Sequence, residues 1–305
     1  MKLYFAPLEG VTDVYFRRIH ADLFGTSPMG KADEYFAPFL SITQDLKIHE
    51  RDLHALAKEK NAGMHVVPQI MTNRADAFLS AARQLWDLGY DEVNLNLGCP
   101  SGTVVGKNRG AGFLSEPDML DRFFYTVFSD PLFTSTEMRL SVKSRLGMVD
   151  PDEFKDILEI YNRYPISELI LHPRVRKEMY KGDVHTDMTA YTSEHTTIPL
   201  CCNGDLFTVR DVDHLFRALP KEPHALMFGR GAVSNPNLFL EVRQYLAKET
   251  VTPLTKEQLW QFSDALCRDA QTRLSGAAYA VPFKGALGIL DRIVCRCRAL
   301  PKTSA

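Results

Sequence analysis

Short apolar segments rich in branched side chains recur along the first 230 residues, and amphipathic segments of helical period separate them. The pattern predicts eight strands, over Leu3–Ala6, Lys31–Tyr35, His65–Met71, Glu92–Leu97, Arg139–Lys143, Glu168–His172, Pro199–Cys202 and Ala225–Phe228. The second of these has the weakest pattern. Strands that alternate with helices are typical of parallel β-α units.

Three of the separating segments carry clear helical signals. They are Asp76–Leu88, Asp152–Tyr164 and Val209–Leu219, and a glycine or proline, which commonly ends a helix, follows each of them. Eight strand–helix repeats in about 230 residues fit an α/β TIM (β/α)8 barrel, which typically takes ~250 residues. A doubly wound sheet is the alternative, but it usually carries a Gly-x-Gly-x-x-Gly motif after an early strand, and none follows Leu3–Ala6.

The pattern becomes purely helical after about residue 247. Two helices are predicted there, one that Thr255 can cap and that runs to about Leu274, and one from about Pro282 to Ala299. We therefore predict a barrel domain over residues 1–247 and a small C-terminal helical domain over residues 248–305. Residues 240–305 hold 10 Lys and Arg against 6 Asp and Glu, although the whole chain has a net charge of −2. A basic tail indicates a polyanionic partner or, equally, a solvated helical face.

Composition narrows the class of protein. Hydrophobic residues make up 45% and charged residues 24% of the chain, which is ordinary for a soluble globular protein. No apolar run approaches the ~18 residues of a membrane helix, and the N-terminus has no secretory signal pattern. The six cysteines show neither zinc-site nor disulfide spacing. We expect a cytoplasmic, metal-free, monomeric protein.

Polar residues and glycines gather where the predicted strands end, and in a TIM barrel the active site lies at those carboxyl ends. The groups are Pro7-Leu8-Glu9-Gly10, Gln69, Asn96-Leu97-Gly98-Cys99-Pro100, Lys143 with Arg145, His172 with Arg174, Asn203-Gly204-Asp205 and Gly229-Arg230-Gly231. The last two groups predict a phosphate site, because glycines let backbone N–H groups approach the anion and Arg230 supplies a charged fork. Two tight turns with a surface arginine are the alternative.

Lys143 and Cys99 are the residues with the most distinctive chemistry. A lysine in the barrel mouth requires an opposing anion, which could be a reduced flavin, although a Schiff-base role or an ion pair with Glu9 or Asp205 remains open. Cys99 could be a nucleophile, a proton donor or inert. Thiols are mostly protonated at neutral pH and can donate a proton. The glycines at 102, 106, 110 and 112 predict a mobile lid after Cys99.

Six blocks of sequence then make a resemblance visible. They are Phe5–Asp13, Gln69, Asn94–Pro100 with Gly110-Ala111-Gly112, Ser141–Gly147, His172-Pro173-Arg174 with Tyr180 and Gly182, and Asn203–Asp205 with Phe228–Ala232 and Asn235-Pro236. In order and spacing the chain resembles the FMN-dependent tRNA-dihydrouridine synthases over roughly residues 3–240. It departs from the family's usual residues at Leu8, Met71, Asn94 and Met188, and its C-terminal domain is short.

The resemblance implies roles for individual residues. Pro7, Leu8 and Glu9 would line the flavin, Gln69, Lys143 and His172 would contact its ring or ribityl chain, and Asn203, Gly204, Asp205, Gly229 and Arg230 would hold its phosphate. Cys99 would be the general acid, and Asn96, Arg145 and Arg174 would face the target uridine. The helical C-terminal domain would bind tRNA, with Lys284 on a phosphate.

The function that the resemblance implies is reduction of a tRNA uridine to 5,6-dihydrouridine. NADPH or NADH would reduce FMN, and the target base would turn out of the tRNA fold into the barrel mouth. An FMN-dependent reductase of a small molecule, of the dihydroorotate dehydrogenase or ene-reductase type, is the first alternative, although a basic helical tail has no obvious use there. A non-catalytic RNA-binding barrel is the second.

Overall fold

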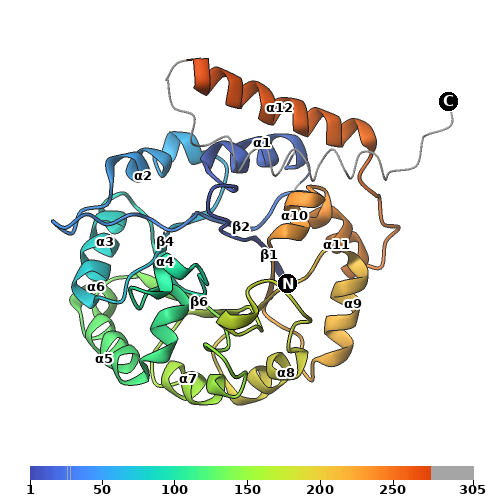
Figure 1. Ribbon diagram of the computed structural model, residues 1–305. Coiled ribbons are helices and arrows are strands. Elements are labelled where there is room, and N and C mark those ends of the chain that lie inside the picture. Colours follow the sequence, from blue (N-terminus) through green and yellow to red (C-terminus); the bar gives the residue numbers. More distant parts are fainter. Residues whose placement is uncertain (26, 28, 276–305) are drawn as a thin grey trace.

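The computed structural model describes residues 1–25, 27 and 29–275 (Figure 1). Its centre is a sheet of parallel strands, in the order β3-β2-β1-β9-β8-β7-β6-β5-β4. The strands are β1 (Lys2–Phe5), β2 (Glu34–Phe36), β3 (Val66–Val67), β4 (Gln69–Ile70), β5 (Glu92–Leu97), β6 (Arg139–Ser144), β7 (Glu168–Leu171), β8 (Leu200–Asn203) and β9 (Ala225–Phe228). The predicted TIM barrel is therefore confirmed.

The predicted third strand bends at its middle and closes the barrel. Its first half, β3, pairs with β2, and its second half, β4, pairs with β5. Pro68 lies between the halves and has no N–H to offer a ladder, so the pairing changes partner there. Nine short strands thus occupy the eight positions that the sequence predicts.

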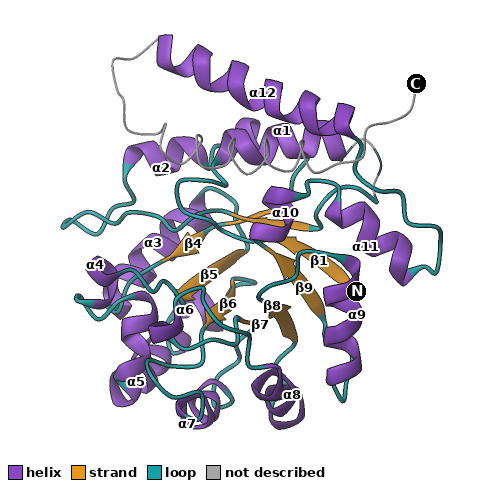
Figure 2. Cartoon of the chain, turned by 45° about the vertical axis from the view of Figure 1, so that its right-hand side comes forward, coloured by secondary structure: helices purple, strands orange, loops and turns teal. Residues whose placement is uncertain are grey.

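Helices surround the barrel and bury its outer face (Figures 1 and 2). The helices are α1 (Val14–Phe24), α2 (Glu50–Ala55), α3 (Ala75–Asp87), α4 (Gly102–Val105), α5 (Pro117–Phe128), α6 (Pro131–Thr134), α7 (Glu153–Tyr161), α8 (Thr186–His195), α9 (Val209–Ala218), α10 (Arg230–Ser234), α11 (Leu238–Leu246) and α12 (Lys256–Ser275). Three short 3-10 helices are η1 (Lys58–Asn61), η2 (Gly110–Ser115) and η3 (Arg176–Glu178). The large apolar core lies between strands and helices, and a smaller cluster that includes Tyr4, Phe36 and Met227 fills the barrel itself.

The second strand is displaced from its predicted range. It runs over Glu34–Phe36 rather than Lys31–Tyr35. Arg243 donates to the backbone carbonyls of Met29 and Lys31, at 2.7 and 2.6 Å, so these groups are satisfied outside the sheet. The hydrogen bonds from Arg243, which lies on α11, therefore help to set where β2 begins.

The C-terminal segment packs directly on the barrel's first helix. Thr255 accepts a hydrogen bond from the backbone N–H of Gln258 at 3.2 Å, which confirms the predicted cap of α12. The Phe262 ring lies edge-on to Phe16 and Phe24, with centroids 5.4 and 5.6 Å away. Figure 1 shows α12 lying alongside α1. The predicted second helix, Pro282–Ala299, lies outside the described residues, and the domain boundary after residue 247 stays a prediction.

Three buried glutamates meet at the end of the barrel opposite the strands' carboxyl termini. Glu34, Glu92 and Glu168 begin β2, β5 and β7, and each side chain is nearly excluded from solvent. Burial, together with the charges of the other two carboxylates, raises the pKa of Glu168 to about 8. Tyr4 donates a hydrogen bond to Glu168 at 3.1 Å, and Lys2 binds Glu34 at 3.0 Å. Glu168 therefore carries a proton at neutral pH.

This shift predicts a pH dependence of stability. The pKa of Glu168 is higher in the folded state than in the unfolded chain, so the folded state binds the extra proton between about pH 4.5 and pH 8. Stability should fall as the pH rises through that window. Glu168→Gln, which stays neutral, should match the parent near pH 5 and exceed it by about 3–4 kcal/mol near pH 8.5. Urea unfolding at both pH values measures the difference, and parallel pH profiles for the two proteins would contradict it.

Candidate active site

A cavity of about 560 Å³ opens at the carboxyl ends of the strands. Its lining includes most of the residues singled out in the sequence: Pro7, Leu8, Glu9, Asn96, Cys99, Lys143, Arg145, His172, Asn203, Gly204, Asp205, Gly229 and Arg230. Gln69 and Arg174 are not among its lining residues, and both side chains are fully buried. Lys284 lies outside the described residues. The parallel strands thus bring nearly all of the predicted groups to one place.

A chain of buried amides fixes the segment that carries Cys99. The Asn96 side-chain oxygen accepts hydrogen bonds from the backbone N–H groups of Gly98 and Cys99, both at 3.0 Å. Asn96 donates to the Gln69 oxygen at 2.8 Å, and Gln69 donates to Asn94 at 2.8 Å. Each amide orients the next, so the cysteine's backbone is tied to two neighbouring strands.

The chain of amides continues toward the opposite end of the barrel. Asn94 donates to the Ser141 hydroxyl at 3.0 Å, and that hydroxyl donates to Glu92 at 2.8 Å. Asn94 therefore accepts from Gln69 and donates to Ser141 at once. An ionised aspartate at this position could accept but could not donate. The two partners of Asn94 therefore favour an amide at position 94.

The glycines after Cys99 pack tightly rather than forming a lid throughout. Gly110 has a φ of +55°, and a Cβ there would lie 2.9 Å from the Cys99 Cβ. Residues 110–114 are buried, and the Ala111 N–H donates to the Cys99 carbonyl at 3.1 Å. Only the stretch around α4 is largely exposed. The lid prediction is wrong for η2, because a close backbone approach requires glycine just as a hinge does.

Lys143 lies in the cavity wall without an acidic partner. Its Nζ donates to the Asn203 side-chain oxygen at 2.9 Å, and Asn203 in turn donates to the Met227 carbonyl at 2.7 Å. Within the described part of the chain no carboxylate lies within ion-pair distance of Lys143, so the ion pair with Glu9 or Asp205 is not formed. Burial, with a smaller effect of nearby Arg145, lowers the pKa of Lys143 to about 8. An anion beside this ammonium would stabilise its charge.

His172 is held neutral by its surroundings. Burial and four neighbouring cations lower the pKa of the imidazole well below its ordinary value. Arg174 lies 3.3 Å from Nε2 and can only donate, so Nε2 accepts and the ring proton lies on Nδ1. Gly204 has a φ of +119°, and a Cβ there would approach the imidazole to 2.9 Å. Glycine is therefore required at 204 to let the turn after β8 close on His172.

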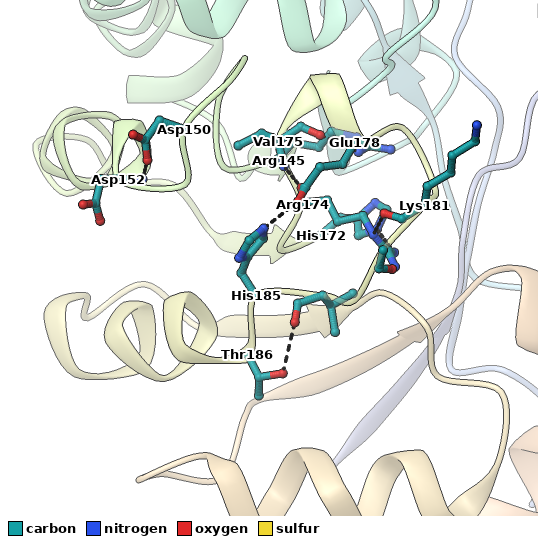
Figure 3. Close-up of polar contacts among 12 residues, drawn as sticks. Arg145, Asp150, Asp152, His172, Arg174, Val175, Glu178, Lys181, His185 and Thr186 are labelled. Carbon is teal, nitrogen blue, oxygen red and sulfur yellow. Dashed lines mark hydrogen bonds and ion pairs between the residues drawn. The ribbon is translucent and has the colours of Figure 1, made fainter.

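Asp205 joins two arginines at the edge of the cavity. Its carboxylate forms ion pairs with Arg174, which is buried, and with Arg230, which is partly exposed. Arg174 also donates to the carbonyls of Lys181 and Gly182 (Figure 3). Arg174 thus lies beneath the site, where it orients Asp205 and His172 rather than reaching the cavity.

Tyr180 is a cavity residue to which the sequence analysis gave no role. Its ring is half exposed and lies over two guanidinium groups, those of Arg145 at 5.2 Å and Arg230 at 5.1 Å. It also faces His172, with ring centroids 6.2 Å apart. Phe207 supports Arg230 from another side at 5.4 Å. The contacts with two arginines, which follow β6 and β9, reveal the role of these rings, which the spacing of Tyr180 and Phe207 in the sequence does not indicate.

Comparison with protein families now adds a decisive observation. Residues 4–282 match the family model described as dihydrouridine synthase (Dus). The chain belongs to the dihydrouridine synthase family. The match covers the barrel from the middle of β1 onward and includes Cys99 and every residue that lines the cavity.

Curated relatives of this family member carry consistent names. The chain is 27% identical over 251 residues to tRNA-dihydrouridine synthase B of Pasteurella multocida, covering 82% of this chain and 71% of the relative. It is 29% identical over 253 residues to a probable tRNA-dihydrouridine synthase of Staphylococcus aureus, with 80% and 72% covered. It is 27% identical over 247 residues to tRNA-dihydrouridine(16) synthase of Cupriavidus necator, with 79% and 73% covered.

Solved structures share the fold at low sequence identity. Morphinone reductase aligns with a TM-score of 0.54 at 10% identity, covering 84% of this chain and 88% of that chain. Histamine dehydrogenase from Rhizobium sp. 4-9 aligns with a TM-score of 0.57 at 9% identity, covering 87% and 49%. At this identity the alignments establish the barrel architecture alone.

Two features of the described residues bear on partners. Between residues 1 and 275, apart from the undescribed 26 and 28, no helix combines the length and apolar character needed to span a membrane. The same residues contain no group of three or more His, Cys, Asp or Glu arranged to hold a metal ion. Cys99, Cys201, Cys202 and Cys267 are free thiols.

The amide chain makes a prediction about stability. Asn94→Leu should leave the buried Gln69 donor without its acceptor, at a cost of about 1–3 kcal/mol in the free energy of unfolding. Ser167→Ala is the matched control, because the buried Ser167 hydroxyl has no hydrogen-bond partner in the structure. Urea unfolding should show a loss for the first variant and none for the second. If Asn94→Leu and the parent have equal free energies of unfolding, the hydrogen bond between Gln69 and Asn94 does not contribute to stability.

Proposed function

We propose that this protein reduces a uridine of tRNA to 5,6-dihydrouridine, with FMN as cofactor and NADPH or NADH as the source of electrons. The observation that carries the proposal is the set of side chains that line one cavity in a member of this family. The cavity brings a free thiol, Cys99, together with Lys143 and Arg230. The names of the curated relatives support the same substrate.

The residues around the cavity fit a flavin nucleotide. A volume of about 560 Å³ lies in the ordinary range for cofactor sites. Lys143 lacks an anionic partner among the described residues and would provide one end of the site with a cation for the flavin ring. Gly229, Arg230 and the turn at Gly204 would hold the phosphate at the other end, since glycines and an arginine fork suit a dianion.

Bound FMN, once reduced by the nicotinamide, would supply a hydride to C6 of the uracil ring. Cys99 would deliver the proton to C5 from its thiol, so that one hydride and one proton add across the C5=C6 double bond. Solvent would then reprotonate the thiolate. Asn96 and the buried amides behind it would keep the Cys99 backbone fixed during this step.

Two side chains remain available to bind the base. Asn96 has one N–H that its bonds to the protein do not use, and the Arg145 guanidinium, which bonds to Gly98 and Val175 and lies beside the Tyr180 ring, lines the cavity. These donors would bind the uracil carbonyl oxygens. Arg174 would act through Asp205 and His172, which it contacts, rather than on the base. The target nucleotide would have to leave the tRNA stack to reach them.

The remaining expectations complete the proposal. Residues 248–305 would add to the tRNA-binding surface, with Lys284 on a phosphate. The protein would act as a monomer in the cytoplasm and would need no metal. The test that separates this function from a small-molecule reductase is mass spectrometry of tRNA before and after incubation with the protein and NADPH. A non-catalytic barrel would be recognised by the lack of flavin absorption after purification.

Arg230→Ala tests the phosphate end of the site. A charge-assisted hydrogen bond contributes about 1.5–3 kcal/mol, so the affinity for FMN should fall by at least about tenfold. Arg217→Ala removes an exposed arginine of α9 and should retain FMN as the parent does. Fluorescence titration of the apoprotein with FMN measures both. Parent-like affinity in Arg230→Ala would place the phosphate elsewhere.

Cys99→Ala tests the proton donor. Flavin binding and NADPH oxidation without tRNA should stay near the parent values, because the thiol is proposed to act on the uracil alone. Formation of dihydrouridine in a single turnover should slow by roughly 10²–10⁴-fold, the usual contribution of a general acid. Cys267→Ala, which removes a free thiol of α12, is the control. If Cys99→Ala matches the parent in the single-turnover rate, another group donates the proton.

A further inference from the structure

The loop between β7 and α8 forms one side of the cavity mouth. It continues from His172 and Arg174, and its Tyr180 side chain lines the cavity. Lys177, Met179 and Lys181 flank Tyr180 in sequence but face solvent and do not line the cavity. The loop therefore presents a second surface, next to the active site but outside it.

The backbone of this loop is held at several points. The N–H groups of Arg176 and Lys177 donate to the carbonyls of Gly147 and Met148, at 2.8 and 3.0 Å, which ties the loop to the neighbouring segment after β6. Arg174 donates to the carbonyl of Lys181 at 3.2 Å. These bonds fix the main chain, so the exposed side chains are presented from a rigid support.

Glu178 secures the same loop from within. Its carboxylate accepts the N–H of Val175 at 2.8 Å and lies 2.7 Å from Nε2 of His185 (Figure 3). The glutamate is thereby engaged in the loop's own structure and forms no described ion pair with Lys177 or Lys181. Figure 3 shows the Lys181 side chain extending away from the group formed by His172 and Arg174.

A strained turn sets the outward direction of the tip. The Glu178 carbonyl accepts the N–H of Lys181 at 2.9 Å, with Met179 and Tyr180 between them. Met179 has φ 56° and ψ −98°, close to the position where a type II′ turn usually takes glycine. A methionine in this conformation costs free energy that the anchoring bonds must offset. The turn leaves Met179 39% and Tyr180 50% exposed.

Three cations of the loop lack acidic partners. Within the part of the chain that the structure describes, Arg176, Lys177 and Lys181 take part in no ion pair. The Nε of Arg176 is buried and has no hydrogen-bond partner there. Glu178 and Asp183 are the carboxylates of the loop itself, and neither forms a described ion pair with these cations. Residues 173–186 hold four cationic side chains, of Arg174, Arg176, Lys177 and Lys181, against the carboxylates of Glu178 and Asp183, so the loop carries a net positive charge.

We propose that this loop is a docking surface for the RNA backbone on one side of the target uridine, with Lys177 and Lys181 on phosphates. The inference rests on the proposed function, because it assumes that a tRNA nucleotide enters the cavity. Phosphates that flank a flipped nucleotide must lie at the rim of the pocket that receives it. A rigid rim with unpaired, solvated lysines meets that requirement, since lysine binds phosphates as a mobile point charge.

The distribution of the cations favours RNA over the nicotinamide dinucleotide. Lys177 and Lys181 stand on either side of an exposed turn and do not converge on the cavity. Dinucleotide phosphates need groups that converge on one short pyrophosphate, whereas an RNA strand offers a phosphate at every nucleotide. Dispersed charges on an exposed surface therefore suit an RNA strand better than a pyrophosphate.

Charge reversal in the flavin-loaded full-length protein tests the proposal. Lys177→Glu, Lys181→Glu and the double variant are compared with Lys221→Glu, an exposed lysine just before β9 at the other end of the barrel. The probe is an unmodified tRNA transcript, and its affinity is measured between about 50 and 300 mM salt. Thermal unfolding is recorded for each variant and should not change, since neither lysine side chain has a described hydrogen-bond or ion-pair partner.

Each single reversal should weaken tRNA binding by about fivefold or more and reduce the log–log salt slope by roughly 0.7–0.9. The double variant should lose about twice that slope, and Lys221→Glu should match the parent. Unchanged affinity and slope in the double variant would overturn the proposal. A raised KM for NADPH with unchanged tRNA binding would overturn it in favour of a dinucleotide surface. Failure of the parent itself to form dihydrouridine would instead refute the proposed function.

Discussion

Buried amides must find partners inside an apolar barrel, and this requirement links the fold to the chemistry of the site. The amide of Gln69 on β4 forms hydrogen bonds with those of Asn94 and Asn96 on β5. Asn96 in turn accepts the backbone N–H of Cys99. Because β4 and β5 pair in register, a displacement of one against the other would break the two bonds that Gln69 makes across them. The backbone of Cys99 is thus positioned by strand pairing together with its own loop, where the Ala111 N–H donates to the Cys99 carbonyl.

The adjacent wall of the cavity, which begins at β6, depends on a different constraint, the concentration of positive charge. Lys143, Arg145, Arg174 and Arg230 surround the neutral His172, and Asp205 joins only the last two arginines. Burial lowers the pKa of Lys143 because no described carboxylate stands beside it. A site with four cationic side chains and one carboxylate among them is suited to an anionic ligand. The strained, lysine-bearing loop above it extends the same charge to the surface.

Much of this arrangement could be predicted from the sequence. Alternating apolar segments predict the barrel, and the rule that parallel strands end on one face collects Cys99, Lys143 and Arg230 without a structure. Sequence alone could not predict that Gln69 and Arg174 do not line the cavity, because their positions depend on cross-strand register and on Asp205. The glycines near Cys99 were misread since tight packing and mobility use the same residue. Residues 276–305, where Lys284 lies, are outside the described structure.

The central claim is that electrons stored in this protein reach a uracil in tRNA. Its most direct test is a single turnover without oxygen, in which the prereduced protein is mixed with an unmodified tRNA transcript. The tRNA is then digested to nucleosides, and their masses are measured by mass spectrometry. The account predicts a nucleoside two hydrogens heavier than uridine, formed in proportion to the flavin that is reoxidised and at the same rate. A protein that stays reduced with tRNA, yet is rapidly reoxidised by a small unsaturated carbonyl compound, would contradict it.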